Sequence, residues 1–447
     1  MKRTSKLVAF ICATGFAGQL MAQQPTIANW RAYDQTGINV FETPKTTDSK
    51  FDGLKVRWGA GFTQQYQSLK HENTATSNGG TTVATAGTNK LYPIAPGFLT
   101  AQANLFMDVQ LADGIALNVT SYLSSRHHNE TWVKGGYIQF DKLPFKGEFW
   151  DNLMKITTIK VGHFEVNYGD QHFRRSDGGQ ALYNPFMEGY IMDAFATEIG
   201  GEVYIKKNGL FGMLGVTNGM IKGNIDSIQP TTADANTNRN PSIYLKGGID
   251  KKLDNGVRVR LSGSFYHNSS SAGSGLTLYG GDRTGSNYQN VVEKWVASGA
   301  AQASTAIAFS GRFNPGFSKK IDAAMINGFV KAGGAELFAT YETSKGRTKT
   351  ETADRKASQF AIDGVYRLGK AENTFVGVRY NAVTAQIAGT PNDVKVDRLA
   401  FAGGWFISKN TLLKLEYVTQ KYKDFLVTDH RNGAKFNGIV LEAVVGF

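Results

Sequence analysis

The amino-acid sequence predicts an all-β chain that forms a transmembrane antiparallel β-barrel. Three observations support this fold class: an export signal at the N-terminus, apolar residues that alternate with polar ones over segments of about ten residues, and short turns that alternate with long polar connections. A soluble β-sandwich also shows alternation, so only the combination of the three favours a barrel. We predict sixteen strands, and eighteen is the next count.

Residues 1–22 have the features of a secretory signal peptide. A basic beginning and a short apolar run over residues 7–16 precede small residues that end at Ala22. The apolar run is too short to cross a bilayer as a helix. The one cysteine of the sequence, Cys12, lies in this segment, so we expect the exported chain to have no thiol for a disulfide, a metal site or a nucleophile.

Composition agrees with a chain of many strands. The 447 residues include 51 Gly and only 10 Pro, and 12% of them are aromatic, which is typical of strands with aromatic anchors and tight turns. The net charge of +12 is compatible with acidic polysaccharide, lipid phosphate, nucleic acid or small anions. Charge alone does not choose among them. For an exported barrel we expect lipid and small solutes as partners, and no nucleic acid.

The strands follow from alternation and turn signals. From Leu54 to Phe62 every second side chain is apolar, and the turns Asp113-Gly114 and Asn208-Gly209 each join two such segments, whereas the longest polar connection spans residues 268–318. We therefore predict strands at 54–66, 98–111, 115–126, 131–141, 154–168, 194–206, 210–220, 241–252, 257–267, 320–331, 335–345, 357–368, 374–386, 395–408, 411–422 and 435–447.

Residues 295–317 decide between sixteen and eighteen strands. They contain a strand-like stretch, Thr305–Phe313, which we assign to the fifth surface loop because sixteen strands then place every long loop on one side. Before the first strand, residues 23–52 are polar and lack helical periodicity. We predict a periplasmic N-terminal segment there and a barrel over residues 53–447.

The final strand carries a specific feature. Ile439, Leu441, Ala443 and Val445 share one face with Phe447, where the sequence stops. An aromatic residue that closes an alternating strand resembles the signal read by the bacterial barrel-assembly machinery. That resemblance implies that Phe447 is an assembly signal.

If the apolar faces contact lipid, the opposite faces line the lumen, because a cation that faces hydrocarbon near the middle of the bilayer costs about 2–4 kcal/mol. By parity the lumen receives nine basic residues, Lys55, Arg57, Lys246, Arg258, Arg260, Arg367, Arg379, Arg398 and Lys414. It also receives five carboxylates, Glu198, Glu202, Asp363, Glu416 and Glu442. Such a basic excess favours anions. The alternative is that these cations form ion pairs that brace the wall.

The third surface loop, residues 169–193, contains His172, Arg174, Arg175 and Asp177. We predict that it folds into the lumen and narrows it, as the corresponding loop does in general porins. The arginines either face passing solutes or pair with carboxylates and pin the loop. His163-x-Glu165 and His127-His128 lack a third ligand at a recognisable spacing, so we expect no metal and no cofactor.

The segment that opens this loop resembles the phosphate-selective porin family of the O/P type. The similar residues are Gly162-His163-Phe164-Glu165-Val166-Asn167-Tyr168-Gly169-Asp170 and Phe173-Arg174-Arg175-Ser176-Asp177. Residues 29–33, 41–43 and 194–202 look more like Bacteroidetes-type relatives of that family. The resemblance implies a sixteen-stranded homotrimer that passes small anions. Of the basic ladder on which phosphate specificity rests in that family, Arg174 and Arg175 are the residues that match.

The predicted function is passive diffusion of small anionic or neutral solutes across the cell outer membrane, with a preference for anions, of which phosphate is one candidate. Two alternatives stay open. A barrel enzyme needs a catalytic constellation, which the seven histidines do not suggest. A surface adhesin or structural barrel would use the long fifth loop.

Overall fold

The wall of the barrel is one closed sheet. The computed structural model describes the chain except residues 1–24, 43–44, 46–50, 77–88, 124–130, 176–179, 220–229, 272–275, 277, 283 and 295–309. Its strands are β1 (Lys55–Glu72), β2 (Gly97–Phe98), β3 (Gln102–Ala112), β4 (Ile115–Leu123), β5 (Thr131–Phe140), β6 (Thr157–Glu165), β7 (Thr197–Lys207), β8 (Leu210–Thr217), β9 (Ser242–Lys252), β10 (Arg258–Asn268), β11 (Lys320–Ala332), β12 (Ala335–Arg347), β13 (Arg355–Leu368), β14 (Thr374–Ala385), β15 (Val394–Ser408), β16 (Thr411–Lys423) and β17 (Lys435–Gly446).

Each strand pairs antiparallel with its neighbours, and β1 pairs with β17 to close the barrel. Both β2 and β3 pair with β1, so they form one interrupted wall strand and the wall has sixteen strands, as predicted. The alternative of eighteen is excluded because β10 pairs directly with β11, from Arg258 opposite Lys331 to Asn268 opposite Ile321. The wall therefore receives no strand from the connection between β10 and β11.

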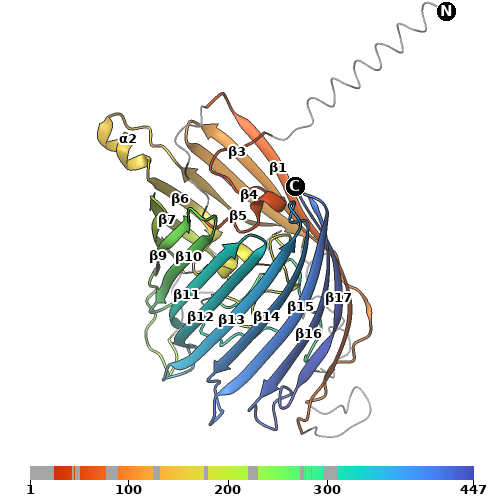
Figure 1. Ribbon diagram of the computed structural model, residues 1–447. Coiled ribbons are helices and arrows are strands. Elements are labelled where there is room, and N and C mark those ends of the chain that lie inside the picture. Colours follow the sequence, from red (N-terminus) through yellow and green to blue (C-terminus); the bar gives the residue numbers. More distant parts are fainter. Residues whose placement is uncertain are drawn as a thin grey trace, which may run out of the picture.

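The two ends of the barrel differ as the sequence predicts. Two-residue turns such as Asp113-Gly114 and Asn208-Gly209 lie at one end, together with the C-terminus (Figure 1). One connection at this end contains a short helix, α2 (Glu148–Met154), where the prediction began a strand at 154. The long connections lie at the other end. No helix in the described part of the chain is long and apolar enough to span a membrane.

The outer face of the wall is apolar. On β17, Ile439 and Leu441 are 47% and 46% exposed, whereas Val440 and Glu442 between and after them are buried in the interior. The same alternation runs along β11 to β16. The last residue completes the closure, because Ala60 and Phe447 exchange backbone hydrogen bonds of 2.9 and 3.1 Å.

The described residues of two long connections fold into the barrel. Loop 3, residues 166–196, joins β6 to β7, and loop 5, residues 269–319, joins β10 to β11. Tyr168 and Ile191 of loop 3 are 1% and 0% exposed. The backbone N–H of Phe313 in loop 5 donates to the carbonyl of Ile191 at 2.7 Å. The described residues at the end of loop 5 thus contact loop 3, in agreement with the assignment of this stretch to a loop.

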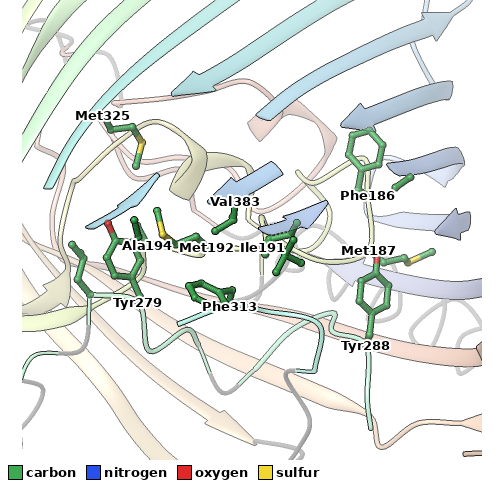
Figure 2. Close-up of a cluster of buried hydrophobic side chains, with 14 of the residues drawn as sticks. Phe186, Met187, Ile191, Met192, Ala194, Tyr279, Tyr288, Phe313, Met325 and Val383 are labelled. Atoms are coloured by element: carbon green, nitrogen blue, oxygen red, sulfur yellow. The ribbon is translucent and has the colours of Figure 1, made fainter. Parts of the chain in front are cut away.

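An apolar cluster fills part of the interior between loop 3 and the wall. Ile191 and Met192 of loop 3 lie beside Val383 of β14, and Phe186 and Met187 of the same loop belong to the same cluster farther away (Figure 2). We expected the inward face to be polar throughout. Where loop 3 packs on β13 to β17, several inward positions are instead apolar, namely Ala357, Val383, Val396, Val418 and Val440. Alternation alone does not reveal this, because both faces of those strands meet an apolar environment.

The described part of the N-terminal segment, residues 25–42, lies against the inner wall. The Tyr33 hydroxyl donates to Asp108 of β3 at 3.0 Å, and Asn39 Nδ2 donates to Glu336 of β12 at 2.6 Å. Since β3 and β12 lie on opposite sides of the ring of strands, the segment crosses the lumen. Both contacts lie near the end with the short turns.

The domain boundaries of the sequence analysis stay predictions. The signal peptide over residues 1–22 falls outside the described residues. We predicted a periplasmic N-terminal segment over residues 23–52 and a barrel over residues 53–447. The residues described within 25–42 contact the barrel interior, because Tyr33 and Asn39 find buried polar partners there.

Candidate solute pathway

Loop 3 is held inside the barrel from its first residues onward. Gly169 adopts a positive φ of 73°, a conformation that glycine reaches at no steric cost. The next residue, Asp170, is 1% exposed and accepts hydrogen bonds of 2.7 Å from Arg260 Nε and Nη2. Its carboxylate also lies 2.7 Å from Lys246 Nζ. These charge-assisted bonds direct the loop toward the lumen.

The cations that the sequence singled out in this loop are pinned by carboxylates and amides. Arg174 Nη1 donates to Asn39 at 2.5 Å, and Arg175 Nη2 donates to Asp193 at 2.8 Å. His172 Nε2 lies 2.7 Å from Asn167 Oδ1. All three predicted residues are buried. The fourth, Asp177, lies outside the described residues.

The far part of loop 3 carries a buried carboxylate with cations on both sides. Glu188 Oε2 accepts from Arg398 Nη2 of β15 at 2.6 Å, and Glu188 Oε1 lies 3.5 Å from Arg312 Nε of loop 5. Arg312 Nη1 also lies 2.7 Å from Asp193. Burial raises the pKa of Glu188, and Arg398 and Arg312 offset only part of that shift. Arg312 thereby links loop 5 to loop 3.

Wall carboxylates accept hydrogen bonds from both loops, mostly from tyrosine hydroxyls. Glu342 of β12 accepts from Tyr168 of loop 3 at 3.1 Å and from Tyr279 of loop 5 at 2.7 Å. Glu416 of β16 accepts from Tyr288 of loop 5 at 2.5 Å and from a loop 3 amide at 2.9 Å. The five carboxylates predicted on the inward face are all buried: Glu198, Glu202, Asp363, Glu416 and Glu442.

Each of the nine basic residues predicted on the inward face forms a salt bridge. Arg57 Nη2 lies 2.7 Å from Asp108, and Lys414 Nζ lies 2.6 Å from Glu442. The sequence left open whether such cations face solutes or brace the wall, and the geometry is that of bracing ion pairs. The other pairs are Lys55 with Asp52, Lys246 with Glu42 and Asp170, Arg258 with Asp250, Arg260 with Asp170, Glu42 and Asp250, Arg367 with Glu336, Arg379 with Asp363, and Arg398 with Glu188.

A cavity of about 240 Å³ lies beside the part of the lumen that loop 3 fills. Its wall comes from β3 to β7, and the N-terminal segment and loop 3 close its other side. The cations among its lining residues are Arg31, Lys134, Lys160 and Lys206, and its carboxylates are Glu42, Asp141 and Glu165. The cavity combines these charged groups with many aromatic side chains.

The charges of this cavity are not balanced. Glu42 lies 2.9 Å from Lys246, Asp141 lies 3.4 Å from Lys45, and Glu165 lies 3.6 Å from His172 and 4.0 Å from Arg175. Every lining carboxylate therefore has a basic neighbour. In the described part of the chain, no carboxylate forms a salt bridge with two of the lining cations, Arg31 and Lys160.

Arg31 and Lys160 are held by other groups. Arg31 donates to the carbonyls of Gly37 and Phe173, both at 2.9 Å, and lies 3.7 Å from the ring centroid of Tyr183. Burial lowers the pKa of Arg31 to about 10, so it stays charged at neutral pH. The Lys160 ammonium lies 5.0 Å from the ring centroid of Tyr137. Carbonyl oxygens and aromatic rings thus hold these two cations, and neither forms a salt bridge within the described residues.

The cavity continues toward the end with the short turns. A second cavity, of about 620 Å³, shares the lining residues Asn29 and Asp141 with the first. It opens beneath the connection that carries α2, where Trp150 and Met154 line it. The two cavities therefore lie next to each other, on the side of the lumen away from the strands on which loop 3 packs.

Sequence reasoning missed Arg31 and Lys160. Lys160 lies between Ile159 and Val161, so parity alone places it on the inward face of β6. Arg31 had no such signal, because it belongs to the segment that we expected outside the barrel. Its position depends on the fold of the N-terminal segment across the lumen.

The histidines do not gather into a ligand set in the described part of the chain. No group of three His, Cys, Asp or Glu side chains there could hold a metal ion. His163 and His172 line the cavity singly. His127 and His128 lie outside the described residues.

Comparisons with known proteins show the fold. No family model matches the sequence, and no curated protein matches it. An anion-selective porin from Comamonas acidovorans has a similar structure, with a TM-score of 0.51 and 12% identity over 88% of this chain and 100% of that chain. The outer-membrane channel DcaP of Acinetobacter baumannii gives a TM-score of 0.48 with 12% identity over 88% of this chain and 98% of its own. OmpF of Salmonella typhi gives 0.49 with 10% identity over 89% and 98%.

The first of these likenesses supports a porin fold. Together with the closed barrel and its apolar outer face, it places the chain in the outer membrane, as the sequence predicts.

Proposed function

We propose that the protein is a passive diffusion channel of the outer membrane for small hydrophilic solutes, with a preference for anions. The observation that supports this most is the cavity along β3 to β7, whose carboxylates all have basic neighbours, whereas Arg31 and Lys160 form no salt bridge with a carboxylate among the described residues. A fixed positive potential along a narrow path attracts anions and offsets part of their dehydration. The proposal involves no chemical step.

Loop 3 sets the width of the path in this proposal. The described residues of the loop pack on β13 to β17, and the cavity lies beside β3 to β7, which agrees with an inward-folded constriction loop. We assign the arginines of the loop to its position, because Arg175 pairs with Asp193 and Arg174 Nη1 lies 3.7 Å from Glu336. We also propose that the chain assembles as a homotrimer and that residues 1–22 direct its export.

From the resemblance to the phosphate-selective O/P type family, the proposal keeps the preference for anions and not the preference for phosphate. A phosphate ladder requires several cations free to bind the anion, and the nine inward cations are engaged in salt bridges. The structure therefore supports a general anion preference better than a preference for phosphate.

Planar bilayers test the proposal. Purified protein should give discrete conductance steps, and a KCl gradient should give a reversal potential that favours Cl⁻ over K⁺. Lys160→Gln should lower this preference, because it removes a cation that no carboxylate neutralises. Lys395→Gln is a matched control: it removes the same charge from a side chain 54% exposed and paired with Asp424 at the far rim.

Two results would contradict the proposal. One is a bilayer record without steps, or one that prefers K⁺. The other is an equal loss of anion preference in the Lys160 and Lys395 variants, which would assign the preference to overall charge and not to the cavity.

A further inference from the structure

The proposed channel has a cavity whose aromatic lining bears on which anions it takes. We propose that this cavity is a binding site for small organic anions in which one carboxylate is attached to a flat apolar ring. This inference rests on the proposed function, since it names the solute class of the same path. It differs from that function in predicting saturable binding that inorganic anions do not show.

Aromatic rings form one side of the cavity. The rings of Trp30 and Tyr137 are stacked at a centroid distance of 5.8 Å, and Phe164 meets Tyr137 edge-on at 6.1 Å. Tyr204 lies on the neighbouring strand β7 and also lines the cavity. Tyr137 belongs to β5 and Phe164 to β6, so the wall presents adjacent rings over three strands. Such a surface favours a flat apolar body through offset or edge-on contacts.

The cation that would receive the carboxylate lies between these rings. Lys160 Nζ is 5.0 Å from the ring centroid of Tyr137 and 5.2 Å from that of Tyr204. In the part of the chain that the structure describes, neither a salt bridge nor a hydrogen bond engages this ammonium. The Tyr137 hydroxyl makes no hydrogen bond within the same part. A lysine donor and a phenol donor on one side can bind the two oxygens of one carboxylate.

A second cation lies on the opposite side. Arg31 belongs to the N-terminal segment and stacks over Tyr183 of loop 3, with its guanidinium carbon 3.7 Å from the ring centroid. Its hydrogen bonds to Gly37 and Phe173 fix the guanidinium plane. A ligand whose carboxylate binds Lys160 would have this second positive charge on the side of the N-terminal segment, which adds to the attraction for an anion.

The same surroundings disfavour inorganic oxyanions. Phosphate exposes oxygens in all directions and is strongly hydrated, whereas the ring faces that line the cavity carry a partial negative charge. A carboxylate on a ring needs donors at one end only and offers an apolar face to the rest of the lining. The volume of about 240 Å³ lies below the range of roughly 300–1,000 Å³ that holds drug-sized ligands. A single ring therefore fits better than a larger molecule.

Titration calorimetry of the full chain in detergent tests the inference without relying on conductance. Benzoate is the probe, and acetate, inorganic phosphate and benzyl alcohol separate the contributions of the ring and the charge. We expect saturable benzoate binding that is about tenfold or more tighter than that of each of the other three. Lys160→Gln should weaken benzoate binding by a similar factor, whereas Lys395→Gln should leave it unchanged.

The result is interpretable even where a variant folds poorly. Tyr137→Phe keeps the ring and removes the hydroxyl, so it should fold and lose only part of the benzoate affinity. Equal affinity for benzoate and acetate, or unchanged binding in the Lys160 variant, would overturn the inference. If the channel prefers Cl⁻ in bilayers but does not bind benzoate, the proposed function stands and the inference fails. If the protein binds benzoate saturably but gives no conductance steps, the inference stands and the proposed function fails.

Discussion

Replacing Arg398 by methionine should release loop 3 from the wall. Arg398 is 1% exposed at its side chain and donates to Glu188, which is 0% exposed, at 2.6 Å. Without Arg398, Arg312 at 3.5 Å is the cation that remains in a salt bridge with the Glu188 carboxylate among the described residues. Removal of one partner from a buried pair costs about 3–5 kcal/mol, because the other charge stays buried without compensation. By contrast, the exposed pair of Lys423 and Asp397, at 52% and 24%, is worth about 0–1 kcal/mol.

Two measurements detect the release. Thermal unfolding in detergent should show Arg398→Met well below the wild type and Lys423→Met close to it. Single-channel conductance should rise in Arg398→Met, because Glu188 gains hydration if loop 3 moves away from β15. The double variant Arg398→Met with Glu188→Leu should recover most of the lost stability, since no buried charge is left unpaired.

The cost of Arg398→Met should also depend on pH. Burial already raises the pKa of Glu188 above its ordinary value of 4.5, and loss of Arg398 removes an interaction that lowers it. A carboxyl group with a raised pKa in the folded state contributes stability that is fully present below the ordinary pKa and is lost as the pH rises through the folded-state value. The variant should therefore come closest to the wild type near pH 4, and the gap should open as the pH rises past the raised folded-state pKa of Glu188 in the wild type.

One outcome would refute this reasoning. If Arg398→Met matched the wild type in unfolding temperature and conductance at neutral pH, and the double variant did the same, the ion pair would not hold loop 3.

Three further predictions concern the loop entrance, the outer face and the last residue. Gly169→Ala should lower stability by about 1–3 kcal/mol in thermal unfolding, because its φ is positive and a Cβ would meet Met325, whereas Gly263→Ala has open space and should change little. Leu441→Arg should reduce stability in refolding experiments by about 2–4 kcal/mol if its outward position lies near the bilayer middle, and an unchanged value would place this face away from lipid. Phe447→Ala keeps the backbone bonds that close the barrel, so protein refolded in vitro should stay nearly as stable. In cells, the amount of this variant in the outer membrane should fall. Equal cellular amounts would show that Phe447 is not an assembly signal.

The wall of the barrel could be predicted because its pattern is local. Neighbouring side chains on β17, such as Ile439 and Val440, face lipid and interior in turn, and this period of two is visible in any short window of the sequence. Short turns such as Asp113-Gly114 and Asn208-Gly209 fix where each strand ends. Strand number and topology follow from these two signals.

The interior could not be predicted in the same way. Parity placed Arg398 inward but did not show its partner, because Glu188 lies 210 positions away in the sequence. Parity also did not show that Arg31 enters the lumen, since its segment has no periodicity. The pathway depends on which cations remain without a carboxylate, and that depends on all such long-range pairs.

The sequence by itself determined a sixteen-stranded barrel with an apolar outer face, a basic excess inside and a third loop rich in charge. The tertiary structure decided that the described parts of loops 3 and 5 and of the N-terminal segment share the lumen. It also decided that the nine basic residues predicted on the inward face form ion pairs, whereas Arg31 and Lys160 form no salt bridge within the described residues. The physical reason is the range of the interactions. Contact with lipid requires an apolar outer face on every strand, so it leaves a local pattern in the sequence. A buried charge is stabilised by an oppositely charged residue that can be distant in the sequence, so its partner is known only from the fold.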